Sequence, residues 1–495
     1  MGQIRFIAPR RDRVSDEAIQ RAYMAGMEQI PWHCRTGWSG NEIVIERNID
    51  ESGCLFVTWD VEGHGTLILS TTSLMQREQP YNLPLELARG TINRIRNQLA
   101  IWQPQGFTAS ESLEHELQAA TEQFIAAATS QDEPVNCADR SEVAMKHAVN
   151  AIKQLGGTFA NQVLSIRHQQ TQKLPTLMAG SLDSGPLTET QSQQFQTAFN
   201  MAALQMNWHD IELNEGEHDW AETDQQVEWA RKSGLKVCAG PLLRFTQRNL
   251  PDWIYLWDDD FESVRQYALS YVEEVVKRYR GSVHIWHCAA GMNLPGAIKL
   301  PEEYKLKLTV DAIQTVIQAD TRAPVIVSFD QPWAEYLASQ DLDLSPLHFA
   351  DALVRADLGV AGIGLEINLG YWPNGTLPRD ALEINRLIDH WGHLGLPLLI
   401  FLTVPSSDET DAHARRQANV VSNTFPGGVS LESQQETVRD ILPLLLSKQS
   451  VHAVVWNQMC DDQPHDFPHG GMFDAEKNAK PALQMISQVR QKHLS

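Results

Sequence analysis

Residues 398–404 read Leu-Leu-Ile-Phe-Leu-Thr-Val, an almost continuous apolar run. Runs of this length and character are typical of strands in parallel sheets, where both faces are buried. Similar runs recur through the second half of the chain, and the amphipathic stretches between them predict helices, for example at residues 262–279, 304–319, 380–394 and 431–446. The expected strands are residues 175–181, 202–208, 236–243, 284–290, 324–329, 361–368, 398–404 and 452–457.

This alternation of strands and helices decides the fold class. Eight β/α units within residues 174–490 match the size of a closed (β/α)₈ barrel. The alternative is an open, doubly wound sheet, which would carry a glycine-rich phosphate loop after an early strand, and the sequence has no such loop. We therefore expect an α/β protein whose residues 174–495 form a TIM barrel.

The first third of the chain has a different pattern. Short β-branched or aromatic runs at residues 42–46, 53–60 and 65–70 predict a β-rich, sandwich-like domain over residues 1–108. Two helical stretches follow, at residues 110–129 and 139–172, and the first opens with Ser110 as a helix cap. We expect residues 109–173 to form a helical connector to the barrel.

Composition and charge limit the partners. Of the 495 residues, 42% are hydrophobic, and the net charge of −22 repels nucleic-acid phosphates and anionic membranes. No segment approaches the roughly 20 apolar residues of a membrane span. The basic N-terminal residues are not followed by the apolar core of a signal peptide. The six cysteines are scattered without a Cys-x-x-Cys pair, which favours reduced thiols and a cytoplasmic location. The sequence leaves the oligomeric state open.

A series of short motifs follows the expected barrel from its start to its end. They include Leu-Pro-Asp-Trp at 250–253, Arg-Tyr-Arg-Gly at 278–281, Gly-Ile-Gly-Leu at 362–365, Leu-Gly-Leu-Pro at 394–397, Gly-Met-Phe-Asp at 471–474 and Lys-Pro-Ala at 480–482. In this order the motifs resemble glycoside hydrolase family 10, the xylanase family. The resemblance covers the whole barrel and implies a carbohydrate-related protein.

The resemblance also implies that the family's two catalytic glutamates are missing. Gly291 stands where the family has its acid/base glutamate, and Leu402 stands at the position of the nucleophile, so strands four and seven are expected to bring these two residues to the barrel rim. Retaining hydrolysis needs two carboxyl groups about 5–5.5 Å apart. Glycine and leucine carry none, so the xylanase mechanism as the family runs it is not expected here.

Two other acidic residues are candidates for relocated catalytic groups. Glu366 lies inside the apolar sixth strand, and Asp330 ends the fifth. Carboxyl groups on adjacent strands could separate their pKa values as acid/base pairs do. The alternative is that Glu366 is held by a structural partner, either Arg355 or Arg244.

Active sites of such barrels lie at the C-terminal ends of the strands. Strand four offers His287 and Asn293 there, and strand five offers the stretch that begins at Ser328. Asp461, Asp462, His465 and His469 do not match a compact zinc pattern, so neither a metal nor a cofactor is expected. Candidate ligand-binding residues are Trp208, Arg244, Gln331, Trp333, Asn368, Tyr371, Trp372, Trp456, Asn457 and Gln458, the aromatic ones as stacking platforms for sugar rings or as ordinary core.

Three functions are compatible with these observations. The first is a diverged barrel that binds carbohydrate or another small polar ligand, with the N-terminal domain as a carbohydrate-binding domain by analogy. The second is an active glycoside hydrolase that uses Glu366 and Asp330. The third is a non-catalytic scaffold that docks a partner.

Overall fold

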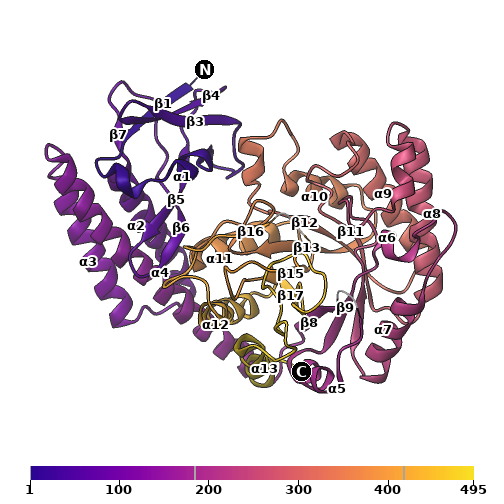
Figure 1. The fold of residues 1–495 in the computed structure, drawn as a ribbon. Coiled ribbons are helices and arrows are strands. Elements are labelled where there is room, and N and C mark those ends of the chain that lie inside the picture. The colour runs from indigo at the N-terminus through magenta and orange to yellow at the C-terminus, as the bar shows by residue number, and fades with distance from the viewer. Residues whose placement is uncertain (1, 183–184, 416–417) are drawn as a thin grey trace.

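A computed structural model describes residues 2–182, 185–415 and 418–495, in which a β-rich N-terminal unit lies beside a closed barrel (Figure 1). Eight parallel strands close the barrel in the order in which they follow along the chain. The (β/α)₈ barrel expected from the apolar runs is confirmed. Its strands are β8 (Leu177–Leu182), β9 (Met201–Leu204), β10 (Lys236–Ala239), β11 (Ile285–Ala290), β12 (Val325–Asp330), β13 (Val360–Asn368), β15 (Leu398–Thr403) and β17 (Val451–Trp456).

Helices surround the barrel, and their apolar faces pack on its outer surface. The second expected strand ends earlier than predicted, because Trp208 already begins a short helix. Within the described ranges, no helix is long and apolar enough to cross a membrane. The helices are α5 (Glu189–Ala198), α6 (Trp208–Ile211), α7 (Ala221–Lys232), α8 (Phe261–Tyr279), α9 (Glu302–Ala319), α10 (Pro346–Arg355), α11 (Ala381–Gly392), α12 (Leu431–Ser447) and α13 (Pro481–His493).

Successive residues of each barrel strand face opposite sides, as the pleat of a strand requires. On β15, Leu399 and Phe401 belong to the small apolar cluster that fills the barrel interior. Leu398, Ile400 and Leu402 belong to the large cluster between the strands and the helices. This alternation decides which side chains reach the site at the barrel mouth.

The N-terminal unit contains two β-sheets, one mixed and one antiparallel, over one apolar core, so the expected β-rich region is confirmed. Helix α2 (Leu83–Trp102) lies inside the range that the sequence assigned to the β-rich domain, and Asn82 caps its first turn. In one sheet, β7 (Tyr81–Asn82) pairs parallel to β1. The other strands are β1 (Gly2–Ile7), β2 (Tyr23–Ala25), β3 (Cys34–Ser39), β4 (Glu42–Arg47), β5 (Cys54–Val61) and β6 (Gly65–Ser70).

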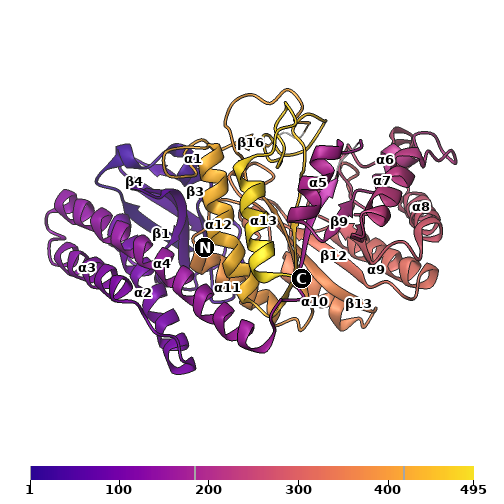
Figure 2. The same cartoon turned by 90° about the horizontal axis from the view of Figure 1, so that it is seen from below.

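Two long helices, α3 (Glu111–Ala128) and α4 (Pro134–Gln170), follow the N-terminal unit. They occupy most of the expected connector, but they do not form a spacer. Helix α4 packs on the N-terminal strands and continues along α11 and α12 of the barrel (Figure 2). Helix α4 therefore contacts both the N-terminal unit and the barrel.

Buried polar contacts reinforce this junction. Arg94 of α2 forms ion pairs with Asp380 at 2.8 Å and with Glu383 at 2.9 Å. The backbone N–H of Thr66 donates to the carbonyl of Asn423 at 2.8 Å, which ties β6 to a loop of the barrel. These contacts tie the N-terminal unit to the barrel through side chains and backbone.

Candidate functional site

Polar side chains gather inside the C-terminal mouth of the barrel. Glu366 and Asn368 alternate on β13 with apolar residues that face the helices, so both are directed inward. Ser328 and Asp330 of β12 lie beside them, with Asp330 the register partner of Glu366. The adjacency of the two carboxylates expected from the sequence is therefore present, and it follows from parallel pairing of neighbouring strands.

Glu366 is buried, at 2% exposure, and both of its carboxylate oxygens accept hydrogen bonds. Ser328 donates its hydroxyl to Oε1 at 2.8 Å. Arg244, from the loop after β10, donates Nη2 to Oε2 in an ion pair. Arg355, the other partner considered, instead pairs with Asp351 on the surface of α10. Of the two structural partners that the sequence left open, the structure selects Arg244.

The Arg244 guanidinium faces several negative charges. Burial lowers its pKa, but Glu366, Asp330 and Asp466 more than offset burial, so the pKa lies above its usual value. Arg244 is therefore charged at every accessible pH. A permanent cation in contact with Glu366 favours the ionised carboxylate, which is the opposite of what a general acid needs.

Asp330 is held on its own strand end. It is 2% exposed, and its Oδ1 accepts the backbone N–H of Gln331 at 2.8 Å. Asn293 donates to the Asp330 carbonyl oxygen at 2.9 Å and to the hydroxyl of Tyr336 at 3.0 Å. These contacts fix the end of β12 and the start of the following loop.

A histidine lies beneath Glu366. The Nε2 of His287 is 2.9 Å from Ser328 Oγ, which in turn bonds Glu366. The imidazole ring also lies 5.0 Å from the Phe401 ring in the apolar interior. Burial lowers the pKa of His287 to about 4, although the charge of Glu366 opposes this shift. His287 is therefore neutral near pH 7 and donates from Nε2 when Ser328 donates to Glu366.

We expect His287 to make the fold acid-sensitive. Its pKa falls from 6.5 in the unfolded chain to about 4 in the fold, so protonation favours unfolding. The contribution of neutral His287 to the free energy of unfolding is fully present above pH 6.5. It is lost as the pH falls from 6.5 to 4, by about 3 kcal/mol at most. Urea unfolding at pH 7, 6, 5 and 4 measures this decline, and His287→Gln should flatten it. An identical pH dependence in the variant would disprove the assignment, because other groups, such as His493, titrate in both proteins.

The two positions of the missing glutamates differ in their surroundings. Gly291 follows β11 with φ +63°, in the left-handed region that favours glycine, and a Cβ there would lie 3.9 Å from Arg244 Nε. Leu402, expected at the rim, instead packs outward between strands and helices. The inward-facing neighbours on β15 are Phe401 and Thr403. The expectation that Leu402 reaches the rim was wrong, because side chains alternate along a strand and Leu402 faces the helices. Neither Phe401 nor Thr403 is acidic.

Asn368 and Thr403 form a second polar group at the mouth. They are register partners on β13 and β15, and both side chains are fully buried. Asn368 accepts a hydrogen bond from Asn457 at 3.2 Å. Within the part of the chain that the structure describes, Asn368 Nδ2 and Thr403 Oγ1 have no hydrogen-bond partner. Such groups are commonly satisfied by water or by a ligand. Thr403 was not among the predicted site residues.

The predicted aromatic platforms are mostly core. Trp208, Tyr371 and Trp456 are at most 2% exposed, and Trp456 packs in the outer apolar cluster. These three rings offer no free face, so their interpretation as platforms is not supported. Trp333 and Trp372 are half-buried, and arginine side chains lie over both rings.

Hydrogen bonds and ion pairs among its own residues hold the loop after β17. Gln458 donates to Asp461 and to the Phe467 carbonyl, and it also accepts from the Phe467 N–H. Asp461 pairs with Lys480, and His465 lies 2.9 Å from Asp411. Gln458 therefore holds its own loop rather than facing the barrel interior.

Comparison with known proteins supports the resemblance noted in the sequence. Residues 166–290 match the family described as Glycosyl hydrolase family 10. Endo-1,4-beta-xylanase 3 of Hypocrea jecorina is 30% identical over 81 residues, which are 16% of this chain and 22% of that protein. Endo-1,4-beta-xylanase B of Humicola insolens is 29% identical over 79 residues, again 16% of this chain and 22% of that protein. The chain thus spans about a fifth of the length of these relatives.

Solved structures agree on the fold. A GH10 endoxylanase from a sugarcane soil metagenome superposes with a TM-score of 0.50 at 14% identity, covering 66% of this chain and 99% of that one. Xylanase 10B of Thermotoga petrophila, solved in complex with xylobiose, gives a TM-score of 0.48 at 18% identity, with 68% and 96% covered. At these identities the likeness is one of fold, that of a closed (β/α)₈ barrel.

Proposed function

We propose that this barrel, with its resemblance to glycoside hydrolase family 10, binds a carbohydrate or another small hydroxyl-rich ligand at its mouth without hydrolysing it. One observation carries the proposal: Glu366 is buried with both oxygens bonded, one by Arg244 and one by Ser328. A carboxylate held in this way is neither a free nucleophile nor a proton donor.

The ligand chemistry is inferred from the second polar group. Asn368 Nδ2 offers a donor and Thr403 Oγ1 offers both a donor and an acceptor, and both lie on the inner face of adjacent strands. Sugar hydroxyls donate and accept in the same way, so they complement these two side chains. A site of this kind rejects ligands that leave its buried polar groups unpaired.

An active hydrolase is the alternative, and the pairing of Asp330 with Glu366 on neighbouring strands favours it. Calorimetric titration with xylobiose and cellobiose, together with assays on 4-nitrophenyl glycosides, separates the functions. We expect saturable binding of at least one sugar and no turnover above the blank. Turnover that Glu366→Gln abolishes would establish the hydrolase. Binding of neither sugar would contradict the proposal and favour a scaffold.

Replacing Thr403 with valine tests the proposed contact directly. The change keeps the shape and removes the hydroxyl, so we expect sugar affinity to fall by about threefold to tenfold, as for one neutral hydrogen bond. The melting temperature should not fall, since that hydroxyl has no partner among the described residues. Thr176→Val is the control for affinity, because Thr176 is buried just before β8, at the opposite end of the barrel. Its hydroxyl donates to the Val451 carbonyl at 3.4 Å, so this variant is compared in sugar affinity and not in melting temperature. Equal affinity of the two variants would count against Thr403 as a ligand contact.

A further inference from the structure

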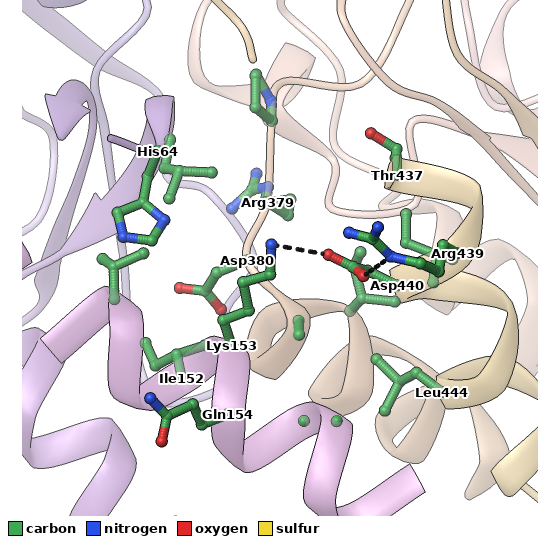
Figure 3. A pocket seen from close by; sticks show the side chains of 18 of the residues that line it. His64, Ile152, Lys153, Gln154, Arg379, Asp380, Thr437, Arg439, Asp440 and Leu444 are labelled. Carbon is green, nitrogen blue, oxygen red and sulfur yellow. Dashed lines mark hydrogen bonds and ion pairs between the residues drawn. The ribbon is translucent and has the colours of Figure 1, made fainter. Parts of the chain in front are cut away.

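A cavity lies outside the barrel, between the N-terminal unit and the barrel helices. It has a volume of about 690 Å³ and is walled by α4 on one side and by α12 and the start of α11 on the other (Figure 3). Ligand sites favour such junctions and have volumes of about 300–1,000 Å³. Its apolar lining includes Val149, Ile152, Ala160, Ile384, Ile441 and Leu444.

Two of the helices that wall the cavity, α4 and α12, contain residues that weaken a helix. Helix α4 carries Gly156 and Gly157 in its interior. Close packing explains Gly156, because a Cβ there would lie 2.9 Å from the Cβ of Ala381. No such contact explains Gly157: apart from its chain neighbours and the backbone of α4 itself, no heavy atom of the described residues would lie within 4 Å of an added Cβ. The missing side chain leaves the cavity open at this point.

Helix α12 contains Pro443, whose ring also lines the cavity. Proline has no N–H, so the carbonyl of Arg439, four residues earlier, loses its helical hydrogen bond. Gly157 of α4 and Pro443 of α12 therefore line the same cavity.

The charged groups at the rim are arranged around one carboxylate. Asp440 pairs with Lys153 at 3.1 Å and bonds Arg439 at 3.2 Å, as Figure 3 shows. Arg439 also approaches Glu436 at 3.6 Å, a residue outside the lining. These pairs are exposed, and exposed ion pairs are weak and exchange readily. An incoming carboxylate can therefore replace Asp440 on the two cations.

A neutral histidine closes the far side. His64 bonds Asn150 at 2.7 Å, and burial lowers the pKa of His64, so the group is uncharged at pH 7. Arg379 also lines the cavity, but it is buried and pairs with Glu335. Among the described lining residues, the exposed cations are Lys153 and Arg439, which lie at one edge. From the apolar walls and this cationic edge, we propose that the cavity binds a small amphipathic carboxylate, with the apolar body between α4 and α12 and the carboxylate at Lys153 and Arg439.

Fluorescence titration tests the site with 8-anilinonaphthalene-1-sulfonate as the probe. We expect saturable binding of one equivalent, displacement by decanoate, and displacement by 1-decanol at least tenfold more weakly. Gly157→Leu should reduce probe affinity at least tenfold, because the leucine side chain enters the cavity at an unstrained helical position. Ser165→Leu, on the exposed face of the same helix, is the matched control.

Lys153→Gln separates the two parts of the proposal. The variant should lower the affinity for decanoate at least fivefold and leave the affinity for 1-decanol unchanged. Thermal melting establishes that each variant is folded. Probe binding that Gly157→Leu does not affect would overturn the site. Equal affinities for decanoate and 1-decanol would overturn the carboxylate assignment. Neither result depends on sugar binding at the barrel mouth.

Discussion

Replacing Arg94 with leucine is expected to lower the free energy of unfolding by about 3–5 kcal/mol, the range for removing one partner of a buried ion pair. The side chains of Arg94, Asp380 and Glu383 are at most 8% exposed. The change leaves two carboxylates buried at the junction of α2 and α11. Arg386 still lies 3.0 Å from Glu383 and offsets only part of that charge. Urea unfolding at pH 7 measures the loss.

The matched control is Arg96→Leu on the same helix. Arg96 is exposed and bonds the hydroxyl of Thr121 at 3.1 Å. Surface substitutions of this kind change stability by about 0.5 kcal/mol or less. If both variants lose the same small amount, the ion pairs do not hold the N-terminal unit to the barrel. A large loss confined to Arg94→Leu supports their role.

The barrel was predictable because its signal is local and repeated. Each apolar run buries both faces of a parallel strand, and eight such runs allow few other folds. Helix α2 was missed although Asn82 marks its start. Its sequence contains Gly90, which lowers helix propensity, and only the packing explains that glycine: a Cβ there would lie 1.9 Å from the Ser70 carbonyl oxygen of β6. Long-range contacts of this kind are not visible in a sequence.

The candidate site was predicted in part. Parallel pairing brings Asp330 beside Glu366, and the choice of Arg244 as the partner of Glu366 was among the alternatives considered. Thr403 was missed and Leu402 was placed at the rim, although a period of two from the inward Phe401 selects Thr403. The burial of Trp456 was not predictable, because an aromatic residue at a strand end is equally compatible with a core and with a platform.

Replacing Glu366 with glutamine is expected to destabilise the fold by about 3 kcal/mol, the lower end of the range for breaking a buried ion pair. Arg244 cannot become neutral, since its pKa is raised, so the variant leaves a half-buried cation without its ion-pair partner Glu366. Asp330 and Asp466 still offset part of that charge, which keeps the loss moderate. A catalytic Glu366 with no structural role predicts the opposite, namely an unchanged melting temperature and lost turnover.

A double-mutant cycle with Arg244→Met makes this distinction quantitative. If the pair is structural, each single variant leaves one charge buried, and the double variant Arg244→Met/Glu366→Gln removes both. The double variant should then lose less stability than the sum of the single variants, by at least about 1 kcal/mol. Additive losses would mean that the contact between Arg244 and Glu366 contributes nothing to the fold. The reason for treating Glu366 as a bound structural carboxylate would then be lost, and the hydrolase hypothesis would regain its candidate acid.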